Sequence, residues 1–504
     1  MNFIKNYFKF DERKATFKKE IIGGISTFLA MAYILAVNPS IVGDSLMNPG
    51  STETAASLSG GLFLATAISA FFGTMLMGLW ANIPIGLAPG MGLNAFFAYT
   101  VSQSVGFNGA LTVTILSGFV YFLIVVTPAR DFISKKIPNN LKLSIGAALG
   151  FFIAYLGMQS SGIIQAHPNT LTTLGDFSNG LVILAIAMLF LGLILHYLKI
   201  PGGILITMVV GAIILIILLQ TGAIANVDEN HSLLGSYADF GSFVDVAKGG
   251  WLGFADIEVW KSPMTYLGIF SFVYLDFFDT TGTLMSLNRM INLDKTDKNW
   301  MNKANKVDAI GTVIGAGIGA TTVTSFVEST VGVSAGAKTG FSAIITASLF
   351  GLSIAAWPIL QVFMPIPITT VVGETTMLTF YQPIIGPILI IVGTLMISQL
   401  KHFEWEITID IPMLFLTIMF MMLTNSIAEG MAAGAITFLV MNFFGGLIQK
   451  ITKKKKVIES MEIQFSTSSP PVKTRDFNYW KRINWVIVFI AVFSITFIII
   501  GIFI

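Results

Sequence analysis

Two aspartates three residues apart have types and spacing that could do chemistry. Asp276 and Asp279 lie in the otherwise apolar stretch YLDFFDTTGTL, residues 274–284. An aspartate at the centre of a membrane helix costs about 2.5–3.5 kcal/mol on insertion scales, so such a residue is by default a functional candidate. Residues three apart share one helix face, with Cβ atoms roughly 5–6 Å apart. Two carboxylates this close cannot both be ionised cheaply in a low dielectric, which favours proton exchange by at least one of them.

Two further polar residues fall at similar expected depth. Glu328 lies in GIGATTVTSFVESTVGVSAGAKTG, and Asn94 lies in NIPIGLAPGMGLNAFF. Each candidate also has a structural reading: Asp279, followed by two threonines, is a plausible hydrogen-bonding residue between helices, and Asn94 is plausible as a polar link between them. Lys338 is read either as a residue at a cytoplasmic span end or as a counter-charge for one of the acids.

The elements that must position these residues are membrane helices. The 504 residues are 54% hydrophobic and 11% charged, with a mean hydropathy of +0.79, which is outside the range of soluble domains. The formal net charge of +2 gives no nucleic-acid footprint, and the absence of cysteine excludes disulfides, thiol catalysis and cysteine metal sites. The fold class predicted is an all-α polytopic membrane protein.

Fifteen spans are predicted from the apolar stretches, all long enough or nearly long enough to cross the hydrocarbon core. They cover residues 20–38, 58–79, 82–103, 109–127, 143–160, 179–197, 202–220, 262–285, 307–321, 322–340, 342–363, 382–400, 411–427, 429–448 and 484–504.

The positive charges indicate how these spans are oriented. With residues 1–19 as a cytoplasmic segment, residues 128–142, 286–306 and 449–456 fall inside and carry four, five and five Lys or Arg residues. The long outside segment 221–261 holds six acids against two lysines. The positive-inside rule therefore agrees with the count, and it places the C-terminus outside the cell membrane.

The first fourteen spans form a transporter domain, residues 20–450, that divides as seven plus seven around the long loop. Because seven is odd, the second half must be inserted upside down, as in an inverted-repeat transporter. The third span of each half is too rich in Gly, Pro, Ser and Thr for a continuous helix. Broken spans at matching repeat positions point to a substrate site near the membrane midplane, with short extended segments that leave backbone groups free for a ligand.

An acidic site with an amide suits a neutral, planar ligand that is rich in N–H donors. The aromatic neighbours are candidates for stacking on such a ring or for simple packing: Phe96, Phe97, Phe277 and Phe278. The same acids would repel anions, which disfavours the main alternative, an anion exchanger of the same seven-plus-seven architecture.

A membrane-embedded enzyme is the other alternative. A paired-aspartate protease needs its aspartates on different helices, whereas Asp276 and Asp279 share one. The histidines are scattered in expected loops or at span ends, so neither a metal site nor a histidine base is expected: His167, His196, His231 and His402.

Four motifs in order resemble the AzgA-like branch of the nucleobase:cation symporter-2 family, over roughly residues 10–450. They are GGISTFLAMAYILAVNPSI, GLAPGMGLNAFFAYTV, YLDFFDTTGTL and FVESTVGVSAGAKTG. Members are permeases for guanine, hypoxanthine or adenine. The resemblance implies proton-driven purine uptake without a cofactor, a plausible homodimer, and an elevator-like motion of a core domain (spans 1–4 and 8–11) against a gate domain (spans 5–7 and 12–14).

Carried over by position, the family's substrate-binding and proton-coupling residues fall on Asp276, Asp279, Glu328, Gly92 and Asn94. Asp276 holds the purine or its proton in this interpretation, and Asp279 tunes the site. The tenth span reads EST where the xanthine and uric-acid branch has a Gln-Asn pair, which disfavours those substrates. Proton against sodium coupling and the preferred purine stay open.

No counterpart in the family is assigned to the tail beyond about residue 450. Residues 451–483 read as a polar cytoplasmic linker, and residues 484–504 read as an additional membrane helix for anchoring or packing.

Overall fold

The computed structural model describes residues 2–46, 55–127, 136, 138–167, 170–198, 200, 202–222, 224, 240–363, 365–372, 375–424 and 426–452, with residues 482, 483, 487, 488 and 492. The predicted linker 451–483 and additional helix 484–504 therefore lie almost entirely outside the described residues.

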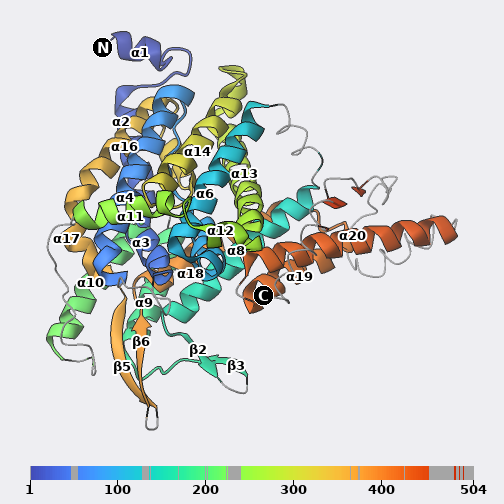
Figure 1. The fold of residues 1–504 in the computed structure, drawn as a ribbon. Coiled ribbons are helices and arrows are strands. Elements are labelled where there is room, and N and C mark those ends of the chain that lie inside the picture. The colour runs from blue at the N-terminus through green and yellow to red at the C-terminus, as the bar shows by residue number, and fades with distance from the viewer. Residues whose placement is uncertain are drawn as a thin grey trace. The chain divides into compact units, whose positions relative to one another are not determined.

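Helices make up most of this described chain (Figure 1). Up to residue 240 the elements are α1 (Asn2–Tyr7), α2 (Phe17–Met31), α3 (Ile34–Asp44), α4 (Ala55–Leu76), the π-helical turn η1 (Met77–Ala81), β1 (Leu87–Pro89), α5 (Met91–Phe96), the π-helical turn η2 (Phe97–Val101), α6 (Ser102–Val126), α8 (Asn139–Ser160), β2 (Ile164–His167), β3 (Leu171–Leu174), α9 (Gly180–Tyr197) and α10 (Gly203–Gln220).

From residue 240 they are α11 (Phe240–Leu252), α12 (Ile257–Lys261), α13 (Pro263–Ile291), α14 (Trp300–Gly317), β4 (Val323–Ser325), α15 (Ser329–Ser334), α16 (Gly340–Leu352), α17 (Trp357–Leu360), β5 (Ile366–Val372), β6 (Thr375–Tyr381), α18 (Ile385–Ile397), α19 (Ile411–Leu423) and α20 (Ile427–Thr452). Short 3₁₀ turns lie at 293–295, 353–356, 361–363, 398–402 and 408–410.

Eight helices of the described chain are long and apolar enough to cross a membrane, which confirms a multi-pass membrane protein. They are Phe17–Gly43, Leu58–Ala81, Met91–Val126, Asn139–Ser160, Gly180–Tyr197, Gly203–Gln220, Ile385–His402 and Glu429–Ile448. The predicted number is larger because other predicted spans are too charged or too short to meet the same criterion. α13 carries its acids in mid-helix, α15 is six residues long, and the single long span Met91–Val126 covers most of the third and fourth predicted spans together.

The chain divides into two compact units, one formed by residues 1–127 and 153–392 and the other by residues 128–152 and 393–504. All the predicted site residues fall in the first unit. The division into a core and a gate domain stays a prediction.

Within the first unit, α13 carries Asp276 and Asp279 in its interior because local signals set both its ends. The side chain of Ser262 accepts a hydrogen bond from the Met264 N–H, and Pro263 takes the first turn, where its missing N–H costs nothing. Asn292, with φ of 55°, ends the helix in the left-handed conformation.

α13 packs on α6 and α14 through a buried apolar cluster, which fixes the direction in which its acids point. The cluster consists of Tyr121, Val125, Val273, Phe277 and Ala309. α6 and α14 approach closely because Gly118 faces α14: a Cβ there would lie 2.8 Å from Cγ2 of Val313.

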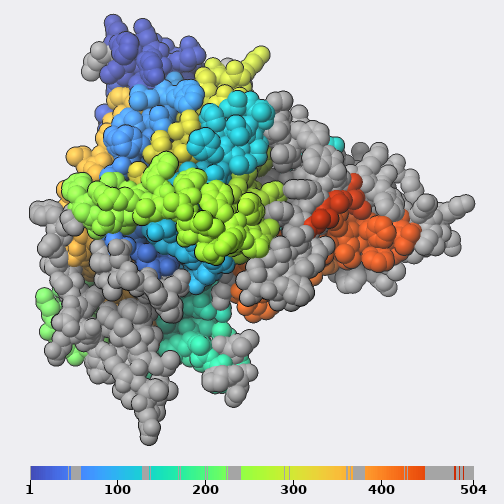
Figure 2. Space-filling model, in the orientation of Figure 1, coloured from blue at the N-terminus to red at the C-terminus, as the bar shows by residue number. Residues whose placement is uncertain are grey.

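Two helices lie in the segment that the sequence reads only as an outside loop. α11 and α12 cross the outer face of the first unit over α6, where they show as a green band in Figure 2. Thr112 donates to the carbonyl of Gly250 at 2.7 Å, and Trp251 Nε1 donates to Gly317 O at 2.9 Å. Two further hairpins, β2–β3 and β5–β6, are also additions to the all-α prediction.

Candidate substrate site

Two three-residue strands mark the breaks in the third and tenth predicted spans. β1 and β4 pair antiparallel, with Leu87 opposite Ser325 and Pro89 opposite Val323. The ladder continues at both ends, from Gly90 N to Thr322 O and from Phe326 N to Gly86 O, each at 3.1 Å. The two broken spans of the inverted-repeat prediction therefore meet each other, and each strand satisfies the other's buried backbone groups.

Threonine hydroxyls from neighbouring helices satisfy the outward edge of each strand. Thr74 of α4 donates to the Leu87 carbonyl at 2.9 Å and accepts from the Leu87 N–H at 2.8 Å. Thr312 of α14 contacts Val323 in the same way, at 3.1 and 3.3 Å. Single hydroxyls that serve as donor and acceptor thus hold backbone that would otherwise be unpaired at membrane depth.

Asp276 is buried against this edge and is 2% exposed. Its Oδ2 accepts from Thr312 Oγ1 at 3.0 Å, whereas its Oδ1 has no hydrogen-bond partner among the described residues. The carboxylate of Asp308 has a larger electrostatic effect on Asp276 than the carboxylate of Asp279 has. The structure therefore pairs Asp276 chiefly with an acid on the adjacent helix α14.

Asp308 was not among the predicted site residues. It is fully buried, and its two oxygens accept from Thr280 at 2.6 Å and from Ser325 at 2.9 Å. The predicted ninth span begins at residue 307, which places Asp308 at a span end, where an acid costs little free energy. α14 instead begins at Trp300, so Asp308 lies two turns inside the helix. An acid followed by AIGTVIGAG was the signal that could have revealed it.

Glu328 and Asp279 lie near each other with their side chains only partly buried. Glu328 stands just before α15, and its Oε1 accepts from the hydroxyl of Tyr33 at 2.7 Å. No hydrogen bond or ion pair to the carboxylate of Asp279 occurs within the described residues. This pair is more exposed than Asp276 and Asp308, which are fully buried.

Asn94 is fully buried in α5, where its side chain is already engaged. Its Nδ2 donates to Asn38 Oδ1 and its Oδ1 accepts from Thr321, both at 2.5 Å. Asn38 in turn donates to Thr66 at 2.8 Å and to the Ala320 carbonyl at 3.3 Å. This amide network ties the first span to both broken spans, and the sequence does not point to Asn38 because it is the last residue of the predicted first span, where polar residues are cheap.

The other predicted residues are placed as follows. Gly92 is the second residue of α5, directly after the break. Phe96, Phe97 and Phe277 are buried, and Phe96 packs edge to face on Phe272, with ring centroids 4.9 Å apart. These three rings therefore fill the core, and the side chain of Phe278 lies outside the described residues.

Lys338 lies at the junction between α15 and α16. Its carbonyl accepts from Arg13 Nη1 at 3.1 Å, and its N–H donates to Glu20 Oε1 at 2.9 Å. No ion pair of the described residues includes the Lys338 side chain. It is therefore the backbone of Lys338 that the N-terminal segment contacts.

This arrangement can accept hydrogen bonds from a ligand and can exchange protons. It contains two accessible carboxylates beside two buried ones, and no group of three or more possible metal ligands occurs in the described part of the chain. Neutral N–H donors match the accessible acids, because a carboxylate accepts through two oxygens.

The fold is that of known membrane transporters. The transmembrane domain of the cyanobacterial bicarbonate transporter BicA superposes with a TM-score of 0.56 at 15% identity, covering 83% of this chain and 97% of that chain. The anion transporter SLC26A9 superposes at 0.52, with 11% identity and coverage of 86% and 67%. These neighbours share the seven-plus-seven arrangement, which confirms the predicted fold class.

The fold is that of a membrane transporter, and the sequence comparisons identify the family of this chain. The model of the permease family Xan_ur_permease matches residues 18–381, so the chain belongs to that family. It is 37% identical over 444 residues to the guanine/hypoxanthine permease PbuG of Bacillus subtilis (strain 168), which covers 86% of this chain and 93% of that one.

The adenine permease AdeP of Escherichia coli K12 is 32% identical over 456 residues, 89% of this chain and 92% of that one. These matches confirm the resemblance to purine permeases, which are transporters rather than enzymes.

Proposed function

We propose that this protein takes up purine nucleobases across the cell membrane. The observation that carries the proposal is the partly exposed acid pair Asp279 and Glu328 at the break of the tenth span, in a member of the permease family. Relatives at 32–37% identity are named guanine/hypoxanthine and adenine permeases. A guanine or hypoxanthine ring is neutral, flat and edged with N–H donors that a carboxylate accepts.

The site residues have different roles in this proposal. Glu328 accepts from the purine edge, and Asp279 completes or tunes that contact. Gly92 lets the ring approach the backbone at the start of α5. Asn94 acts on the substrate through that backbone, since its amide oxygen is held by Thr321 and its nitrogen contacts Asn38.

Uptake is coupled to protons in this proposal, with the proton gradient as the only driving force and no cofactor. Asp276 and Asp308 are buried neighbours, and two buried carboxylates cannot both hold a charge cheaply, so the pair retains a proton. Loading of a proton and a purine from outside, followed by release of both inside, makes the transfer symport.

The mechanical part of the proposal is an elevator-type step in which a core domain moves against a gate domain. The N-terminus is cytoplasmic and the C-terminus extracellular, following the distribution of Lys and Arg. Two copies form a homodimer in the lipid bilayer.

Uptake of labelled hypoxanthine by cells that lack their own purine permeases tests the function. Guanine, adenine, xanthine, uracil and sulfate are added in excess as competitors. Competition by guanine but not adenine indicates a 6-oxopurine carrier, and the reverse indicates an adenine permease. No uptake by protein shown to be in the membrane, with sulfate transported instead, would replace this proposal with the anion exchanger.

A further inference from the structure

Tyr33 lies between α2 and α3 and is fully buried. Its carbonyl accepts from Ala36 and Val37 in the first turn of α3, at 3.1 and 3.0 Å, so its backbone position is set by that turn. Its hydroxyl reaches across to the tenth span and donates to Glu328 Oε1 at 2.7 Å. The ring therefore links the first span to the acid at the tenth-span break.

Small residues bring these two spans close enough for that contact. A Cβ on Gly332 of α15 would lie 2.0 Å from Oγ1 of Thr27 and 2.4 Å from the carbonyl of Gly23, both in α2. Such distances are far inside van der Waals contact, so α2 and α15 touch at their backbones. The close packing leaves Tyr33 little freedom to move away from Glu328.

The hydroxyl of Tyr33 distinguishes the two accessible acids. A phenol has one hydrogen to donate, and here it is given to Oε1 of Glu328, which leaves Oε2 for a ligand. Asp279 receives no comparable hydrogen bond from the described residues. A hydrogen bond to a charged acceptor is about twice as strong as a neutral one, so Glu328 is held in one orientation while Asp279 is not.

We propose that Tyr33 is a positioning residue that fixes the Glu328 carboxylate so that its second oxygen faces the N–H edge of the substrate. This inference rests on the proposed function, because it assumes that Glu328 contacts a purine.

The test compares Tyr33→Phe with Tyr7→Phe in hypoxanthine uptake. Tyr7 lies in α1, and its hydroxyl donates to the carbonyl of Leu79 at 2.7 Å, so the control loses a tyrosine hydrogen bond to a distant part of the chain that involves no acid. We expect Tyr33→Phe to raise the KM by about tenfold or more and to change the pH profile of uptake. Tyr7→Phe should change neither quantity at equal protein level in the membrane.

Two failures are distinguishable. Unchanged KM and pH profile in Tyr33→Phe, with normal wild-type uptake, overturn the role of Tyr33 alone. Absence of purine uptake by the wild-type protein overturns the proposed function, and the inference with it.

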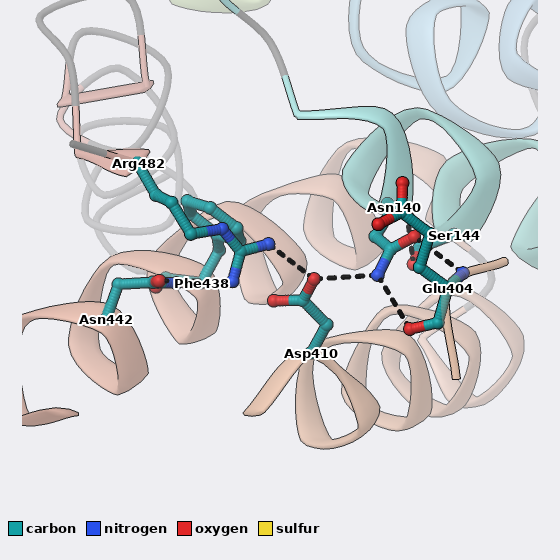
Figure 3. Close-up of polar contacts among 7 residues, drawn as sticks. All are labelled: Asn140, Ser144, Glu404, Asp410, Phe438, Asn442 and Arg482. Carbon is teal, nitrogen blue, oxygen red and sulfur yellow. Dashed lines mark hydrogen bonds and ion pairs between the residues drawn. The ribbon is translucent and has the colours of Figure 1, made fainter. Parts of the chain in front are cut away.

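A separate observation concerns the tail. In the second unit, Asp410 lies just before α19 with its carboxylate fully buried. Its Oδ2 accepts from Asn140 Nδ2 at 2.8 Å and from Arg482 Nη2 at 2.5 Å (Figure 3). Arg482 also donates to Asn442 Oδ1 at 3.3 Å and lies 5.0 Å from the centroid of the Phe438 ring.

The surroundings of Asp410 are preorganised for this ion pair. Asn140 is fixed by the backbone of Glu404, accepting from its N–H at 2.9 Å and donating to its carbonyl at 3.3 Å. Arg482 is the cation paired with Asp410 within the described residues. Removing one partner of a buried ion pair leaves an uncompensated charge, which is strongly destabilising.

Arg482 comes thirty residues after the last residue of α20, Thr452, and lies beyond residues 18–381, which the family model matches. We infer that Arg482 neutralises Asp410 and thereby stabilises the second unit. Asn140 and Arg482 both precede predicted spans that begin on the cytoplasmic side, which is consistent with their meeting at one carboxylate.

Thermal unfolding of the full-length detergent-solubilised protein tests this role of Arg482, with Arg482→Gln, Asp410→Asn and the double variant. We expect Arg482→Gln to lower the melting temperature by several degrees and the double variant to recover most of that loss, because the buried charge is then gone. An unchanged melting temperature in Arg482→Gln, or a double variant no more stable than Arg482→Gln, would overturn the inference.

Discussion

The two broken spans share a backbone plan but differ in chemistry. β1 and β4 pair with each other, and each is followed by a six-residue helix. After β1, the polar residue is Asn94, which is fully buried with both ends of its amide engaged. After β4, the polar residue is Glu328, which is partly exposed and held at one oxygen by Tyr33.

This difference indicates that the first break supports the backbone and that the second break contacts the ligand. A buried neutral amide that is hydrogen-bonded at both its nitrogen and its oxygen rigidifies the break, whereas a partly exposed carboxylate offers a substrate a strong acceptor. We therefore assign the first break to holding the backbone and the second to recognising the purine. The predictions below test that assignment, from the largest expected effect on uptake to the smallest.

Glu328→Gln should abolish hypoxanthine uptake while the protein stays in the membrane. The substitution keeps the shape of the side chain but removes the charge that accepts from both Tyr33 and the purine, a loss of about 10–100-fold or more in affinity. Labelled uptake and membrane protein level are measured together. Normal uptake by this variant would contradict the assignment of purine recognition to the second break.

Asp308→Asn should lower the accumulation of hypoxanthine against its gradient by about 10-fold or more, because a proton-transfer group is lost. Removing this charge leaves Asp276 without its buried partner, so the pair no longer exchanges the coupling proton. Accumulation is measured with and without an inward proton gradient. Asp245→Asn, at an exposed acid paired with Lys248, is the control that should behave as wild type.

Gly332→Ala should reduce uptake several-fold by pushing α15 away from α2. The added Cβ would meet Thr27 and Gly23 at 2.0 and 2.4 Å, and overpacking of this kind costs about 1–3 kcal/mol. Gly43→Ala is a matched control, since no atom lies within 4 Å of a Cβ there. Equal uptake rates for the two variants would show that the close approach does not position Glu328.

Asn94→Ala should lower the melting temperature with little change in the KM for hypoxanthine. It leaves Asn38 and Thr321 with unmatched buried groups, at a cost of about 1–3 kcal/mol. Thermal unfolding and uptake kinetics are measured on the same variant. A large rise in KM without loss of stability would contradict the structural role assigned to the first break and would indicate that Asn94 contacts the substrate directly.

Much of the fold and part of the site could be predicted from residue patterns. The Gly, Pro, Ser and Thr content of two spans predicted the breaks with short extended segments at which β1 and β4 lie, because such residues cannot sustain a membrane helix. The cost of burying charge pointed to Asp276, Asp279 and Glu328.

The rest depended on tertiary contacts. Asp308 follows the lysine-rich NKANK segment, so its burial becomes evident only once α14 is seen to begin at Trp300. Tyr33 and Asn38 are unexceptional residues within an apolar span, and their importance comes from partners almost 300 residues away. α11 was missed because its thirteen residues include Asp245 and Lys248 and form no apolar run of membrane length.

Binding of labelled hypoxanthine to purified wild-type protein and to Glu328→Gln tests the central claim most directly. The account predicts saturable binding by the wild type, displaced by excess guanine or adenine, and no measurable binding by Glu328→Gln at an unchanged melting temperature. Equal binding by both proteins would contradict the claim that the tenth-span break recognises the purine.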